Sequence, residues 1–153
     1  MTMPDDAHNA GDFGVGDSLD ALTQLHTLSV DTGRGFDKMV KKAEPDFLPT
    51  ADRFRALHSR HTARLDAMVR EMGGLPDTDG SFMGTVNVAV VSLRAVFDAI
   101  DADVMDQVRS GEANVIAAFD RAIAASLPKG HRDALVDMKT ELTRLLDDAR
   151  KPG

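Results

Sequence analysis

The sequence predicts an all-α protein whose four long helices form a bundle. Over four segments, hydrophobic residues recur at spacings of three and four, which places them on one side of a helix. The chain has seven Phe and no Tyr or Trp, so Ala, Leu, Val and Met have to fill its core. This mixture suits helices better than strands. A chain of 153 residues is long enough for one domain with one core.

The first 16 residues are predicted to be a disordered leader, followed by a single four-helix-bundle domain at residues 17–150. The leader is rich in Asp and Gly and has little apolar surface to bury. Residues 1–20 contain five Asp and no Lys or Arg, so most of the net charge of −7 belongs to this end of the chain. Asp17 or Ser18 is the expected N-cap of the first helix.

The first two helices are expected at residues 17–42 and 46–72, joined by a short turn into an antiparallel hairpin. Pro45 and Pro49 bracket the turn, and Gly73-Gly74 ends the second helix. Gly33 in the first helix is expected to permit a kink or a close approach of a second helix. The two stripes consist of Leu19, Leu22, His26, Ser29, Gly33, Phe36 and Val40, and of Phe54, Leu57, His61, Leu65, Met68 and Met72.

The second hairpin is expected at residues 102–125 and 129–149, with Asp101 as an N-cap of its first helix. Its stripes consist of Met105, Val108, Glu112, Val115, Phe119 and Ala122, and of His131, Leu135, Met138, Leu142, Leu145 and Ala149. Between the hairpins, residues 82–98 are predicted to form an apolar crossover helix. A link of this length lets the chain return along the bundle, which is the one-crossover topology of ferritin-like bundles.

Composition and motifs exclude several classes of function. No basic stripe is present, so nucleic-acid binding is not expected. The most apolar segment contains Arg94 and Asp98, which makes it too polar for a comfortable membrane span. The absence of Cys excludes disulfides, thiolate metal sites and Cys nucleophiles. The chain shows neither a glycine-rich nucleotide loop nor a signal-peptide pattern, so we expect a cytoplasmic protein that is not an enzyme.

Three stretches of the chain resemble an uncharacterised family of bacterial domains. They are LTQLHTLSVDTGRGF (22–36), REMGGLPDTDGS (70–81) and RSGEANVIAAFDRAI (109–123), and the most similar features are Asp31, Gly35-Phe36 and Gly111-Glu112. The resemblance covers about residues 18–150 and implies a ferritin-like four-helix bundle. The family has no established activity, so the resemblance implies a fold and not a function. This chain has Gly33 where such domains often carry Glu.

Four side chains are candidate ligands for a metal ion inside the bundle. Ferritin-like metal sites use Glu-x-x-His pairs on two of their helices, and the nearest analogue in this chain is His58-x-x-His61. Residue counts from the expected turns place His61, Glu112, Asp31 and Asp137 at one level, within a turn or two of about 5.4 Å each. An Fe, Mn or Zn ion is the cofactor that such a set would take.

The competing interpretation of these residues is structural and needs no cofactor. His61 and Glu112 lie on facing stripes, where they can bond to each other or to Ser29. His58 lies beside its stripe and is expected at the flanking surface.

Three hypotheses follow for the function. The first is a non-enzymatic bundle that acts as a homo-oligomer or through a protein partner, because the helix at 82–98 has a wider apolar face than one groove needs. The second is a degenerate ferritin-like metal-binding protein with its site near His61 and Glu112. A small apolar ligand held between helices is a third alternative.

Overall fold

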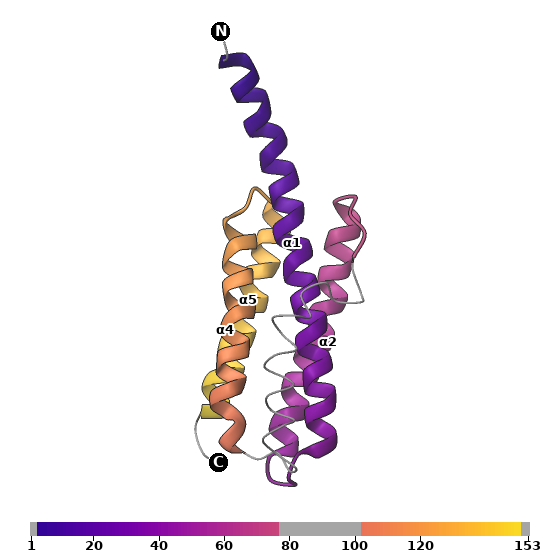
Figure 1. The fold of residues 1–153 in the computed structure, drawn as a ribbon, viewed down its shortest axis with the longest axis vertical. Coiled ribbons are helices and arrows are strands. Elements are labelled where there is room, and N and C mark those ends of the chain that lie inside the picture. The colour runs from indigo at the N-terminus through magenta and orange to yellow at the C-terminus, as the bar shows by residue number, and fades with distance from the viewer. Residues whose placement is uncertain (1–2, 77–101, 151–153) are drawn as a thin grey trace.

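The described part of the chain is entirely helical. The computed structural model describes residues 3–76 and 102–150, with side chains in residues 17–76 and 102–149. Its elements are α1 (Met3–Lys42), α2 (Leu48–Glu71), the short 3₁₀ helix η1 (Ala102–Val104), α4 (Met105–Ala124) and α5 (Lys129–Arg150). No β-strand occurs among these residues, so the prediction of an all-α four-helix bundle is confirmed (Figure 1).

The four long helices form two antiparallel hairpins, α1 with α2 and α4 with α5. The order around the bundle is α1, α2, α5, α4, and each helix runs antiparallel to both of its neighbours (Figure 1). Helix α2 ends at the opposite end of the bundle from the start of α4. The predicted crossover helix at 82–98 and the predicted N-cap Asp101 lie outside the described residues. The ferritin-like assignment therefore stays a prediction.

Helix α1 is longer than expected. It begins at Met3, whereas the capping pattern predicted a start at Asp17 or Ser18. In Figure 1 its first turns extend beyond the ends of the other helices. Among the described side chains, the buried face of α1 begins with Ser18 and Leu22. The prediction of a disordered leader before a domain at 17–150 stays a prediction.

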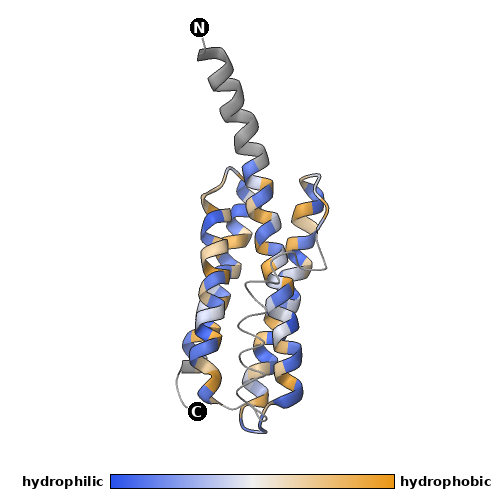
Figure 2. Ribbon diagram, viewed as in Figure 1, coloured by the Kyte–Doolittle hydropathy of each residue, from blue (hydrophilic) through white to orange (hydrophobic). Residues whose placement is uncertain are grey.

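The core lies where the predicted stripes meet. Figure 2 shows hydrophobic and hydrophilic residues alternating along the helices, as expected for helices with one buried side. All six predicted stripe positions of α4 are buried, including the charged Glu112. The largest fully buried apolar side chains are Leu22, Leu25, Phe54, Leu65, Phe119, Leu135, Met138 and Leu142. None of the described helices has an apolar stretch long enough to cross a membrane.

Both ends of α2 follow from local sequence. Pro49 lies in the first turn, where its missing N–H needs no helical partner. At the other end, Gly73 adopts φ +86°, a left-handed conformation that favours glycine. The N–H of Gly73 donates to Arg70 O and that of Gly74 to Val69 O, which closes the helix in a Schellman motif. A Cβ at Gly74 would lie 2.9 Å from both Leu19 Cδ1 and Val69 Cγ1, so this end also packs tightly on α1.

We expect Gly73→Ala to lower the free energy of unfolding by about 1 kcal/mol, because Ala is strained at this backbone conformation. Gly111→Ala is the matched control. Gly111 lies inside α4 with open space around its missing Cβ, so this change should stabilise the protein by about 0.5–1 kcal/mol. Urea unfolding followed by circular dichroism measures both variants, and equal shifts in the same direction would contradict the capping role of Gly73.

Candidate functional site

A buried hydrogen bond joins the two parallel helices α2 and α4. Nε2 of His58 donates to Oε2 of Glu112 over 2.7 Å, and the two side chains are 0% and 1% exposed. Helices α2 and α4 face each other diagonally in the bundle, so this hydrogen bond crosses its interior. Nδ1 of His58 and Oε1 of Glu112 have no hydrogen-bond partner among the described residues. The pair therefore keeps two spare polar atoms in an apolar core.

The second histidine of α2 connects the core to the surface. Nε2 of His61 donates to Oε1 of Glu141 on α5 over 2.7 Å. The other oxygen of Glu141 accepts from both terminal nitrogens of Arg60, at 3.3 and 2.8 Å. His61 is 2% exposed while Glu141 is 47% exposed, so one carboxylate contacts a buried imidazole and a solvated guanidinium at the same time.

Burial lowers the pKa of His61 below its ordinary value of 6.5, because the interior disfavours the charged imidazolium. The hydrogen bond to Glu141 acts in the opposite direction but does not cancel this effect. The nearby His58 and Arg60 lower the pKa further through like-charge repulsion. His61 therefore favours its neutral form in the folded protein.

The two histidines belong to a continuous run of ring contacts. Phe54 and His58 each stack on Phe36, and their ring centroids lie 5.0 and 5.7 Å from that of Phe36. His61 meets His58 and Phe119 edge to face, at 6.5 and 6.0 Å. At Gly33, a Cβ would lie 3.5 Å from the Cβ of His58, so the α1 backbone is close to this helix. Packing from α1, α2 and α4 thus holds both imidazoles in place.

The structure brings the four predicted ligands together only in part. His61, Glu112 and Asp31 are buried, at 2%, 0% and 5% exposure, whereas Asp137 is exposed on α5. Glu112 bonds to His58 and His61 bonds to Glu141. The expectation that His58 lies at the flanking surface is wrong, because α2 buries a face wide enough for both Leu57 and His58.

Glu141 is the site residue that sequence reasoning missed. It lies one helical turn beyond Asp137, within the error of a residue count from the turns. Among the described residues, no group of three His, Asp or Glu is arranged to hold a metal ion. The metal-site interpretation of His61, Glu112, Asp31 and Asp137 therefore stays a prediction.

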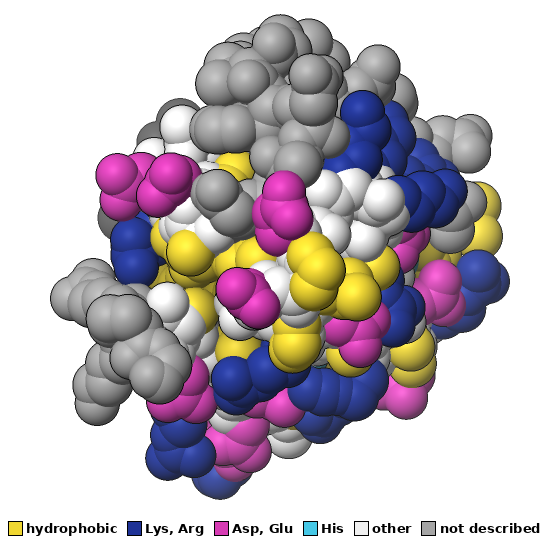
Figure 3. Space-filling view, turned by 90° about the horizontal axis from the view of Figure 1, so that it is seen from below, with side chains coloured by type: hydrophobic (Ala, Val, Ile, Leu, Met, Phe, Trp, Pro, Cys, Tyr) yellow, Lys and Arg dark blue, Asp and Glu magenta, His cyan; other side chains and the backbone are white. Residues whose placement is uncertain are grey.

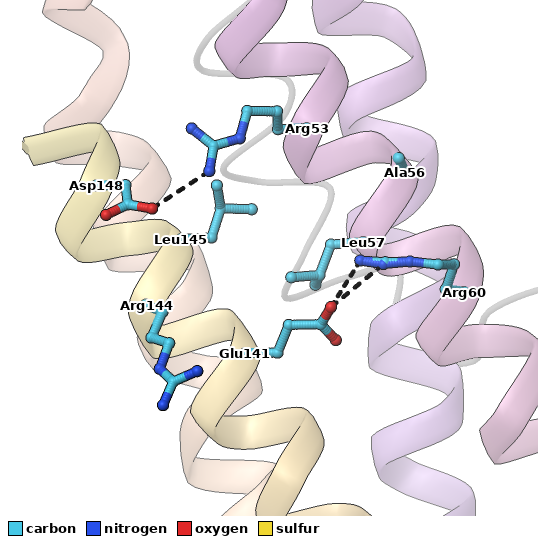
Figure 4. Close-up of a pocket in the computed structure, with 8 residues that line it drawn as sticks. All are labelled: Arg53, Ala56, Leu57, Arg60, Glu141, Arg144, Leu145 and Asp148. Carbon is cyan, nitrogen blue, oxygen red and sulfur yellow. Dashed lines mark hydrogen bonds and ion pairs between the residues drawn. The ribbon is translucent and has the colours of Figure 1, made fainter. Parts of the chain in front are cut away.

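A groove opens between α2 and α5 where Arg60 meets Glu141. Its volume is about 380 Å³. Each helix contributes four residues at spacings of three, one and three, which is one helix face. Figure 4 shows Leu57 and Leu145 between the two helices, with Arg53 paired to Asp148 and Arg60 paired to Glu141 across the groove.

Comparison with known families assigns this chain to a family. Residues 17–125 match the family described as Domain of unknown function (DUF2383). The match spans more than half of the chain. This chain belongs to the DUF2383 family. No curated protein and no solved structure matches it.

The DUF2383 match contains the buried pair but not the whole groove. It includes α2 and α4, and hence His58, His61 and Glu112. Helix α5, with Glu141 and Arg144, follows the matched residues. The expectation of an uncharacterised domain family is therefore confirmed, and the family description assigns no activity to the domain.

We expect Glu112→Ala to lower the free energy of unfolding by about 3 kcal/mol, because it leaves the buried His58 without its partner. Glu71→Ala, which removes an exposed carboxylate 3.2 Å from His131, should change it by only about 0.5 kcal/mol. Chemical denaturation measures both.

The double variant His58→Leu/Glu112→Leu separates pairing from packing. It removes both polar groups, so it should be more stable than Glu112→Ala. A double variant that is less stable than Glu112→Ala would contradict the pairing argument.

Stability should also fall in acid because of His61. Since the folded state lowers the pKa of His61, the unfolded chain binds a proton there more readily. The contribution of His61 to the free energy of unfolding is fully present above its ordinary pKa of 6.5 and is lost as the pH falls below that value. Unfolding free energies measured between about pH 8 and pH 5 should therefore drop more steeply for the wild type than for His61→Gln. Parallel curves would refute this assignment.

Proposed function

We propose that this DUF2383 domain acts without catalysis, by associating with a second copy of itself or with a protein partner. The observation that carries the proposal is an apolar surface at the end of the bundle where α2 begins and α5 ends. Figure 3 views this end and shows hydrophobic side chains gathered near its centre, with Asp and Glu side chains among them and Lys and Arg side chains mostly around them. An apolar centre with a charged rim is typical of protein interfaces.

Leu48 is the most exposed large hydrophobic side chain of this end. It is 39% exposed at the first position of α2. Partly buried Ala43, Leu146 and Ala149 belong to the same end, where α1 and α5 terminate. We call these four residues the end surface. Removing them from water on association would be favourable, because each carries apolar area.

The predicted helix at 82–98 is the other surface that this proposal includes. It lies outside the described residues, so its support is the width of its apolar face in the sequence. One substitution in the end surface and one in the helix at 82–98 show which of these two surfaces forms the interface.

We expect Leu48→Glu to weaken self-association by about tenfold or more, because it replaces the most exposed apolar side chain of the end surface with a charged one. Light scattering over a micromolar concentration range measures the change in mass. Leu75→Glu is the matched control, since Leu75 is 85% exposed just after α2, at the opposite end of the bundle. Val91→Glu tests the helix at 82–98 in the same assay.

A wild-type protein that is a strict monomer, with no co-purifying partner, would refute the proposal. An equal loss of association in Leu48→Glu and Leu75→Glu would refute the end surface. A loss confined to Val91→Glu would move the interface to the helix at 82–98.

The second candidate is binding of an Fe, Mn or Zn ion near His61 and Glu112. Its support is the set of spare buried atoms: Oε1 of Glu112, Nδ1 of His58 and Oγ of Ser29 accept no hydrogen bond from the described residues. Carboxylate oxygen and imidazole nitrogen are suitable ligands for these metals. Metal analysis of protein purified without chelator tests it, and metal-free protein whose melting temperature does not respond to added Fe, Mn or Zn would exclude it.

A further inference from the structure

We propose that the α2–α5 groove binds a small organic acid with an apolar carbon body, and that Arg144 holds its carboxylate. This site is separate from the end surface and from the buried His58–Glu112 pair. It rests on the charges, the lining and the length of the groove.

The charge of the groove favours an anion. Three guanidinium groups, from Arg53, Arg60 and Arg144, line it together with two carboxylates. Asp148 pairs with Arg53 at 3.3 Å and Glu141 pairs with Arg60 at 2.8 Å. Arg144 is exposed and forms no ion pair with another described residue. One positive charge is therefore unbalanced, which suits a ligand with a single negative charge.

The two ion pairs of the groove do not close it to a ligand. Their side chains are between 47% and 61% exposed. Exposed pairs of this kind contribute only about 0–1 kcal/mol, so a carboxylate that enters the groove can compete for their arginines. Glu141 retains its hydrogen bond with His61 when this happens, because that bond uses its other oxygen.

The lining between the ion pairs suits a carbon chain. Leu57 and Leu145 lie between the helices (Figure 4), and half-buried Ala56 also lines the groove. These three residues supply the apolar contact area of a lining whose other five residues are charged. The volume of about 380 Å³ falls in the range of ligand sites.

The length of the groove sets the size of the ligand. Arg53 and Arg60 mark its two ends on α2, seven residues apart, which is about 10 Å along the helix axis. A partner helix would need a longer open groove, because its contacts repeat over several turns. A monocarboxylate with a chain of about this length fits between the ion pairs.

Titration of the ¹⁵N-labelled full-length protein with octanoate, below the concentration at which octanoate forms micelles, tests this proposal. Saturable shifts of backbone amide signals are expected in residues 53–60 and 141–148. Acetate has the same charge without the chain, and octanol has the chain without the charge. Both should bind at least about tenfold more weakly than octanoate, since acetate lacks the apolar chain and octanol lacks the carboxylate.

Substitutions in the groove locate the binding site. Arg144→Gln should weaken octanoate binding about tenfold, because it removes the unbalanced charge. Ala56→Glu should abolish binding, because it fills the groove and adds a negative charge. Arg121→Gln is the matched control, since Arg121 is an exposed arginine on α4 outside the groove, and it should bind octanoate as the wild type does.

Three results would overturn the proposal. They are no saturable shift with octanoate, shifts confined to residues outside the two groove segments, and an equal loss of affinity in Arg144→Gln and Arg121→Gln. The far-ultraviolet circular dichroism and the unfolding midpoint of each variant establish that it is folded. Both substituted arginines are exposed, so neither change is expected to disturb the core.

Discussion

The hydrogen bond between His58 and Glu112 is the constraint on which the interior of this bundle depends. A polar side chain in an apolar core is tolerated only when it is hydrogen-bonded, and here the partner comes from the diagonally opposite helix. The bond therefore determines how far α2 and α4 stand apart. Helix α1 packs against His58 at Gly33, where a Cβ would make an ordinary contact with the Cβ of His58, and Phe36 of the same helix stacks on the imidazole. Changes in any of these residues act first on this one contact.

The fold was predictable because every long helix has a clear hydrophobic period. The stripe of α4 was predicted residue by residue, and every helix end except the start of α1 was correct to within a few residues. The capping pattern predicted that the first helix starts at Asp17 or Ser18, yet α1 begins at Met3. Local composition is a weak guide where a helix continues from a well-packed segment, because elongation adds a backbone hydrogen bond with each residue.

The site was predictable in its residue types but not in its pairing. Glu112 is the acidic residue on the stripe of α4, and His61 lies on the stripe of α2, so both had to face the core. Which imidazole meets which carboxylate depends on helix rotation, where one residue corresponds to about 100°. His58 is buried because the rotation of α2 differs slightly from the one its stripe indicated. Glu141, and not Asp137, contacts His61, because a residue count determines the height along a helix only to about one turn.

The spacing of the two histidines has a mechanical consequence. Side chains three residues apart on a helix point about 60° away from each other, so His58 and His61 engage α4 and α5 separately. If α2 slid along its axis or turned, both hydrogen bonds would break together. Sliding and rotation of helices are common ways for a bundle to pass a signal along its length. This domain opposes them at its centre, so a conformational response would require α5 to swing outward rather than α2 to shift in register.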